Sequence, residues 1–213
     1  MSKPAIAIQC ATHTEAKPFI NYFHCTLLQQ KPFKIFLGDS SLYILIGGIG
    51  ITKAAIAATY ICLVYDVQYI INIGAAGALA LQLLPGDICC VKSVIDNSRY
   101  NLTTLEPFTY TLAPIDLAPI DELQTYRCLS VTKPLRTQDE RLSCSTIADI
   151  VDMELAGIAY ASYKFKKQCY SIKYISDTGQ HTTHKTIMNN IINFSEKTVD
   201  TILEILFSHS LIK

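Results

Sequence analysis

The sequence lacks the features that would direct the protein to a nucleic acid or into a membrane. Lys and Arg number 18 and Asp and Glu also number 18, so the formal net charge is zero. No basic run or stripe interrupts this balance, which argues against a nucleic-acid surface. No apolar stretch reaches the roughly 18 to 20 uncharged residues of a membrane span. We therefore expect neither a nucleic acid nor a membrane as a partner.

The chain also lacks paired cysteines and a secretion signal. None of its eight cysteines forms a CxxC pair, and its five histidines do not stand at zinc-ligand spacing with them. Most cysteines lie in apolar runs, such as Cys62 in an expected helix, which is typical of reduced, packed thiols. The first residues, MSKPAIAIQC, lead directly into an expected strand without a signal-peptide pattern. We expect a cytoplasmic protein with no metal and no cofactor.

What the sequence does contain is an alternation of strands and helices, with half of its 213 residues apolar. The pair Gly38-Asp39 lies between the expected strands 33–36 and 41–46 and indicates a hairpin. The sheet is therefore expected to be mixed and not purely parallel. The prediction is one α/β domain over residues 1–213, a three-layer α/β/α arrangement with a mixed central sheet flanked by helices. The expected strands are 4–9, 33–36, 41–46, 68–73, 88–95, 126–132 and 169–176, and the expected helices are 13–23, 52–64, 137–144, 153–165 and 185–207.

A polar, proline-bearing stretch separates two of these strands, at about 96–124. It contains LAPID twice in tandem, at 112–116 and 117–121, which is too short for a repeat architecture. We interpret the stretch as a surface loop, with a lid as the open alternative. A second polar stretch, Gln180 to Thr186, carries His181 and His184 and is interpreted as a solvated loop.

Two glycine clusters follow expected strands. Gly47-Gly48-Ile49-Gly50 opens a helix, where backbone amides can hold an anion or a ribose; the alternative is a tight turn. No Lys-Ser/Thr follows, so the cluster is neither a Walker A loop nor a full dinucleotide fingerprint. Gly74-Ala75-Ala76-Gly77 stands at the carboxyl end of a strand. It would let a ligand approach the backbone closely, or else allow close helix packing.

Carboxylates gather at the ends of one expected αβ unit. Asp152-Met153-Glu154 stands at the start of the expected helix 153–165, and Asp177 ends the strand that follows. Open α/β sheets place their ligand crevices at such points, and carboxylates there can hold sugar hydroxyls and deliver a proton. Each residue also has a purely structural interpretation. Asp177 could cap a turn, while Asp152, Glu154 and Glu15 could be ordinary acids at helix starts.

The order of these segments resembles the nucleoside phosphorylase superfamily, and within it the methylthioadenosine/S-adenosylhomocysteine nucleosidase-like branch. The resemblance covers nearly the whole chain. It rests on Ile6-Ala7-Ile8 with Thr14-Glu15, Gly48-Ile49-Gly50, IINIGAAGAL at 70–79, Pro85-Gly86-Asp87-Ile88, Val151-Asp152-Met153-Glu154 and Tyr174-Ile175-Ser176-Asp177.

The resemblance implies cleavage of an N-glycosidic bond. Asp177 would match the general acid that protonates the purine at N7, and Glu15 the residue that orients the attacking water. Glu154 would match the carboxylate that grips the ribose hydroxyls, with Met153 packing on the sugar. Carboxylates suit this chemistry because a ribosyl cation develops as the bond breaks. The remaining binding candidates are Asp152, Ser176 as a partner of Asp177, Lys173 near the water, and Gly48, Ala75 and Gly77 in the glycine clusters.

The resemblance leaves the nucleophile to be decided. Phosphate sites usually contain arginine, and neither glycine cluster has one nearby, while Ala75 stands where the family often has serine. Water is therefore favoured, giving a purine nucleosidase that acts on a 5′-modified adenosine such as methylthioadenosine or S-adenosylhomocysteine. A wall for the base is expected from Leu129 to Val131 and Leu135. The family also implies a homodimer or larger homo-oligomer.

Two alternatives stay open. A purine or uridine phosphorylase would use phosphate instead of water. A non-catalytic nucleoside-binding protein on the same fold would not need Glu15, Glu154 and Asp177 together.

Overall fold

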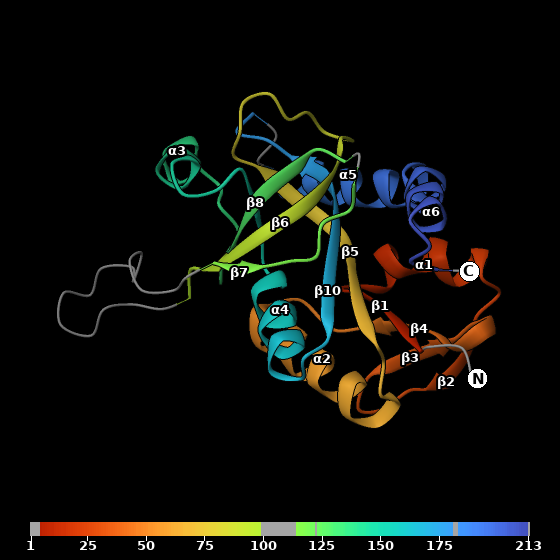
Figure 1. Cartoon of the computed structure of the whole chain (residues 1–213). Coiled ribbons are helices and arrows are strands. Elements are labelled where there is room, and N and C mark those ends of the chain that lie inside the picture. Colours follow the sequence, from red (N-terminus) through yellow and green to blue (C-terminus); the bar gives the residue numbers. More distant parts are fainter. Residues whose placement is uncertain (1–4, 99–113, 122, 181–182, 213) are drawn as a thin grey trace.

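The computed structural model describes residues 5–98, 114–121, 123–180 and 183–212 (Figure 1). The strands are β1 (Ile6–Cys10), β2 (Thr26–Gln29), β3 (Lys34–Leu37), β4 (Leu42–Ile46), β5 (Tyr69–Ala78), β6 (Ile88–Asp96), β7 (Ile115–Asp116), β8 (Thr125–Ser130), β9 (Ile150–Asp152) and β10 (Gln168–Asp177). The helices are α1 (His13–Tyr22), α2 (Ile51–Tyr65), α3 (Gln138–Ser145), α4 (Leu155–Lys164), α5 (His184–Lys197) and α6 (Val199–Ser208), with a short 3-10 turn at Asp39–Ser41.

The sheet is mixed, which confirms the predicted fold class. β1 pairs in parallel with β4 and β5, whereas β2, β3 and β4 are antiparallel neighbours. β5 also pairs in parallel with β10 and in antiparallel with β9. The pairings β9–β8, β8–β6 and β6–β10 then lead back to β5, so these five strands form a closed circuit. The sequence did not indicate this closure.

Helices cover both faces of the sheet (Figure 1). Strand side chains alternate between two cores: Ala7 and Ile70 face α2 and α4, whereas Ile8 and Ile71 face α1 and α6. On the first face α2 and α4 are closely packed, since a Cβ on Gly157 would lie 2.2 Å from the carbonyl oxygen of Ile51. The two cores hold the strand ends, and therefore the residues at those ends, in fixed positions.

A third, smaller core lies beneath α3. It consists of Leu79, Leu129, Val131, Leu135, Cys144, Ala148 and Val151. α3 begins with a capping box, in which the side chain of Thr137 accepts from the amide of Glu140 and the Glu140 side chain accepts from the Thr137 amide. In Figure 1 this helix lies apart from the other helices.

The expected single C-terminal helix is two helices. α5 ends at Lys197 and α6 begins at Val199, with Thr198 between them. The Thr198 hydroxyl donates to the carbonyl oxygen of Phe194 at 2.6 Å, and such back-bonding often bends a helix. The bend lets Ile202 and Leu206 of α6 reach the core beneath α1.

Two other expectations also need correction. The strand expected at 68–73 is longer than predicted, because β5 continues through Gly74 to Gly77 and β10 pairs with it as far as Gly77. The stretch 96–124 is not simply a surface loop, since β7 pairs with β6 and Leu117 and Ile120 are buried. Residues 99–113 and 122 of that stretch lie outside the described residues, as does His181.

The structure also bears on the thiols and on the membrane expectation. The eight cysteines are free, and all except Cys25 are buried. Among the described residues, no helix combines the length and the apolar character needed to cross a bilayer.

Candidate active site

Most of the predicted site residues line one cavity of about 360 Å³ at the ends of β5, β9 and β10. They are Glu15, Ala75, Gly77, Asp152, Met153, Glu154, Ser176 and Asp177. Lys173 and Gly48 are not among the lining residues: Lys173 lies behind Asp152, and Gly48 donates its amide to the carbonyl oxygen of Ala11. The structure therefore brings together both ends of the sequence-predicted site.

Glu15 links α1 to the central sheet. Its Oε2 accepts from the amide and the hydroxyl of Thr12, both at 2.8 Å, which completes a capping box at the start of α1. Its Oε1 accepts from the amide of Ala75 at 3.1 Å. A Cβ on Gly74 would lie 2.8 Å from this oxygen, so a side chain there would displace the carboxylate. Glu15 is thus a helix-start acid and also faces the cavity.

Glu154 is held in the same way by the other glycine cluster. Its Oε1 accepts from the amide of Gly50 at 3.0 Å, and its Oε2 accepts from the amide of Met153 at 3.2 Å. Burial, together with the nearby charge of Asp152, raises the pKa of Glu154 to about 7. Near neutral pH this carboxyl can therefore exist in either protonation state.

Asp152 is engaged by protein groups on both oxygens. Oδ1 accepts from the Ser130 hydroxyl at 2.5 Å, and Oδ2 accepts from Lys173 Nζ at 2.9 Å and from the amide of Leu155 at 3.0 Å. Burial alone would lower the pKa of Lys173, but the charge of Asp152 outweighs it and the pKa is raised. Lys173 is therefore a buried cation that balances the acids. The Leu155 contact supports the helix-start interpretation of Asp152.

Asp177 lies at the end of β10 with a partner on each oxygen. The Ser176 hydroxyl donates to Oδ1, as the predicted pairing of these residues requires. Arg141 of α3 donates to Oδ2 from Nη2. Both Arg141 and Asp177 are buried, at 5% and 6% exposure. This ion pair gives the carboxylate a fixed direction at the cavity wall.

Sequence reasoning missed Arg141. The helix that carries it was expected, but nothing in the pattern connects α3 with a strand end 36 residues later. The argument that no arginine stands near the glycine clusters holds along the chain and fails in space, because Arg141 Nη1 donates to the carbonyl oxygen of Ala78. No local signal in the sequence would have identified it.

Apolar side chains complete the cavity. Val131 and Leu135 line it as expected for the base wall, whereas Leu129 is buried in the core below. Helix α5 adds the apolar side chains of Ile187, Met188 and Ile191 to the lining. It also adds His184, which is exposed at the first turn of the helix. The sequence had not connected this helix with the site.

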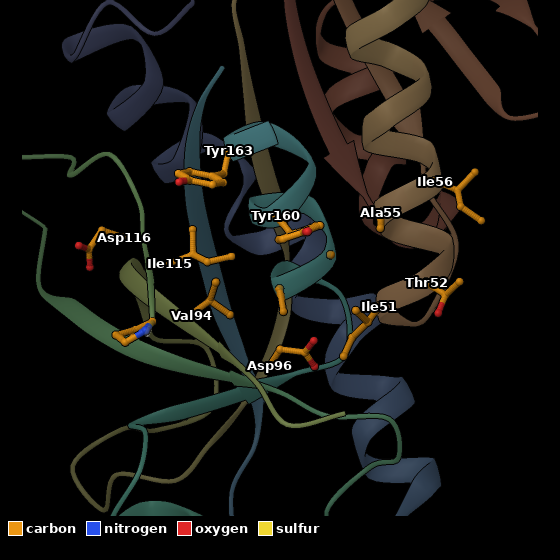
Figure 2. Close-up of a pocket in the computed structure, with 13 residues that line it drawn as sticks. Ile51, Thr52, Ala55, Ile56, Val94, Asp96, Ile115, Asp116, Tyr160 and Tyr163 are labelled. Atoms are coloured by element: carbon orange, nitrogen blue, oxygen red, sulfur yellow. The ribbon is translucent and has the colours of Figure 1, made fainter. Parts of the chain in front are cut away.

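A second cavity of about 780 Å³ lies between α2, α4 and the β6–β7 pair (Figure 2). Its lining is mainly apolar and includes Tyr160 and Tyr163 of α4, Ile51 of α2, and the carboxylates Asp96 and Asp116. None of the predicted site residues, all of which the structure describes, lines this cavity.

Two proteins of similar sequence carry the same name. The 5′-methylthioadenosine/S-adenosylhomocysteine nucleosidase of Baumannia cicadellinicola subsp. Homalodisca coagulata is 26% identical over 68% of this chain and 72% of its own length. The nucleosidase of the same name from Staphylococcus carnosus is 23% identical over 86% of this chain and 89% of its own length.

Solved structures share the fold at lower identity. A futalosine hydrolase of Helicobacter pylori superposes with a TM-score of 0.85 at 16% identity, covering 96% of this chain and 98% of its own. The Helicobacter pylori 5′-methylthioadenosine/S-adenosylhomocysteine nucleosidase with butyl-thio-DADMe-Immucillin-A also gives 0.85, at 15% identity, covering 98% of this chain and 100% of its own. Residues 5–207 match the family profile described as the phosphorylase superfamily, and the chain therefore belongs to that family.

Proposed function

We propose that the protein is a hydrolytic purine nucleosidase, which transfers the ribosyl group of a purine nucleoside to water and releases the free base. The observation that carries the proposal is the placement of Glu15 and Glu154 on the amides of Ala75 and Gly50. Together with Asp177 they give one cavity a carboxylate for each task of the reaction.

The three carboxylates are assigned separate roles. Asp177 delivers the proton that turns the purine into a leaving group. Glu154, beside Met153, binds the ribose hydroxyls. Glu15 orients the water that attacks the anomeric carbon. Lys173 acts indirectly, by neutralising the buried Asp152 next to Glu154.

The same hydrogen bonds favour water over phosphate. A phosphorylase must bind a dianion, and amides in glycine loops are suitable donors for it. Here the amides of Ala75 and Gly50 already donate to carboxylates, so a phosphate at these positions would meet negative charge. Two arginines line the cavity: Arg141 is committed to Asp177 at the other end, and the exposed Arg136 belongs to the loop that carries Leu135 of the proposed base wall. A buried acid beside the base end also argues against a binding protein, since binding alone needs no proton donor.

The preferred substrate follows from the relatives' names and from α5. We propose a 5′-modified adenosine such as methylthioadenosine or S-adenosylhomocysteine. The apolar side chains of Ile187, Met188 and Ile191 along one wall suit a thioether substituent better than a charged phosphate.

Base release tests this function directly. Methylthioadenosine, S-adenosylhomocysteine, adenosine and inosine are incubated with the protein in buffer with and without phosphate. Adenine released without phosphate supports a nucleosidase and ranks the 5′ substituents. Release that requires phosphate would replace the proposal with a phosphorylase, and tight binding without release would favour the binding protein.

We also propose that the protein forms a homodimer or larger homo-oligomer through the outer face of α2 and α4. Large apolar side chains are exposed there, including Leu63 at 65% and Tyr163 at 67%. Light scattering should give a mass above one chain, and Leu63→Asp should reduce it. Leu81→Asp is the matched control, because Leu81 is 99% exposed but lies outside this face. A monomeric wild type would contradict the proposal.

Two further sequence predictions are carried forward as proposals. Residues 1–213 act as one domain, supported by strand pairings that join β1 to β10 in one sheet. The cytoplasm remains the proposed location.

A further inference from the structure

Arg141 is a buried charge in the cavity to which the proposed reaction has so far given no role. Its guanidinium donates four hydrogen bonds. Nε and Nη2 donate to the carbonyl oxygen of Leu135 at 3.2 and 3.1 Å, and Nη1 donates to that of Ala78 at 3.0 Å. The fourth bond joins Nη2 to Asp177 Oδ2.

The three bonds to backbone carbonyls fix the guanidinium plane before any substrate arrives. One of these carbonyls lies in the loop before α3 and the other at the end of β5, so the group is held from two directions. The space is also tight. A Cβ on Gly77 would lie 2.9 Å from Asp177 Oδ2 and 3.1 Å from Arg141 Nη1. A planar fork anchored in this way can set the direction of the carboxylate it contacts.

We propose that Arg141 is a positioning residue for proton delivery by Asp177, an inference that rests on the proposed nucleosidase function. When the O–H bond of the protonated Asp177 breaks, an N–H bond forms on the purine and the glycosidic electron pair passes to the base. The oxygen of a water molecule bonds to the anomeric carbon. One proton of that water stays in the new hydroxyl group, and the other passes to Glu15. The carboxylate left on Asp177 then carries a full buried charge.

Arg141 and Ser176 meet that charge with one donor on each oxygen. Donors that are fixed in advance stabilise a developing charge without reorganising during the reaction. The ion pair already has the arrangement that the acid reaches after it has given up its proton. The contribution of Arg141 is therefore specific to reactions in which Asp177 transfers a proton.

The competing interpretation is that Arg141 only ties α3 and its loop to β5. Its bonds to Leu135 and Ala78 would do this in any protein of this shape. A structural tie affects every substrate alike, whereas a positioning role affects only substrates whose leaving group must be protonated. This difference provides the test.

The test compares wild type, Arg141→Met, Asp177→Asn and the double variant on two substrates. One is the best nucleoside from the base-release panel. The other is the 4-nitrophenyl riboside with the same 5′ substituent, because nitrophenolate leaves without a proton. We expect Arg141→Met to lower kcat on the nucleoside by roughly tenfold or more with little change in KM, and to keep nitrophenyl hydrolysis within about threefold. The double variant should be no slower than Asp177→Asn alone.

Equal losses on both substrates, or additive losses in the double variant, would overturn the proposal. If wild type does not hydrolyse the nitrophenyl riboside, the test rests on the nucleoside rates of the double variant and of Asp177→Asn. If Arg141→Met does not fold, Arg141→Lys replaces it, since lysine keeps the charge but not the planar fork. A wild-type nucleoside rate in Arg141→Lys would also overturn the positioning role.

Arg127→Met is the matched control, because Arg127 pairs with Asp149 at 3.5 Å outside the cavity. It should leave both rates unchanged. Failure of the proposed function is a different result: wild type would release no base from any nucleoside, whereas failure of this inference leaves an active wild type.

Discussion

The two cavities differ in size and in what surrounds them. The larger, about 780 Å³, is lined mainly by apolar side chains of α2, α4 and the β6–β7 pair. The smaller, about 360 Å³, contains Glu15, Glu154 and Asp177, each held by amides or by a cation. By volume alone the larger cavity would be taken as the active site. Bond cleavage, however, needs charged groups held in fixed positions, and of the two cavities only the smaller contains all three acids. The proposed active site is therefore located by preorganised charge and not by volume.

The comparison is tested most strongly by Asp177→Asn. The amide keeps the shape of the carboxyl but carries no transferable proton, so turnover of the nucleoside should fall by at least about a hundredfold. Nucleoside binding, measured by calorimetry, should persist. Near-normal turnover would remove Asp177 from the mechanism and with it the main distinction between the cavities.

The charged cavity should also affect stability in a pH-dependent way. Glu154 has a folded pKa of about 7 against an ordinary value of 4.5. The folded state therefore binds more protons than the unfolded state between these values, and this group's contribution to stability is lost as pH rises through that window. The shift corresponds to roughly 3 kcal/mol.

Urea unfolding of wild type and Glu154→Gln at several pH values measures this effect. The stability of the variant relative to wild type should increase by about 3 kcal/mol between pH 4.5 and pH 7.5. A difference that is constant with pH would show that the carboxyl is not perturbed as the structure indicates.

Glu154→Gln should have a smaller effect on the reaction. A neutral amide still accepts a hydrogen bond from a ribose hydroxyl, but without the charge, so KM should rise by roughly tenfold. Steady-state kinetics of the preferred nucleoside and of its 2′-deoxy analogue give the measurement. An unchanged affinity for both would contradict the ribose role.

The smallest effect is expected from the same exchange in the larger cavity. Asp116→Asn replaces a carboxyl by an amide in the lining formed by β7. Nucleoside turnover should stay within about twofold of wild type, because surface charges far from a site contribute little. A loss comparable to that of Asp177→Asn would show that the larger cavity takes part in catalysis.

The sequence predicted the mixed α/β class because apolar runs, hairpin signals and helix caps are local. It did not predict β2 or β9, which are short and lack an alternating pattern. It ended the strand at Ile73, whereas β5 continues through Gly74 to Gly77, where the lack of a side chain on Gly74 and Gly77 leaves room for carboxylates.

The candidate site divides in the same way. Glu15, Glu154 and Asp177 stand in recognisable motifs, and the structure brings them together. Arg141 and the Lys173–Asp152 pair depend on long-range packing, since their partners lie 36 and 21 residues away in the chain. Pairing between side chains so far apart in the chain produces no periodic pattern in the sequence from which it could be predicted.

The two ends of the cavity are supported by different parts of the fold. Arg141 and the base wall at Val131 and Leu135 belong to α3 and its loop, whereas Glu15 and Glu154 are anchored on α1, β5 and the Gly50 loop. If the proposed roles hold, changes within residues 131–145 will alter which base is accepted while the ribose end keeps its chemistry. An enzyme built in this way can acquire a new nucleoside by exchanging one short segment, which makes that segment the natural target for redesigning its specificity.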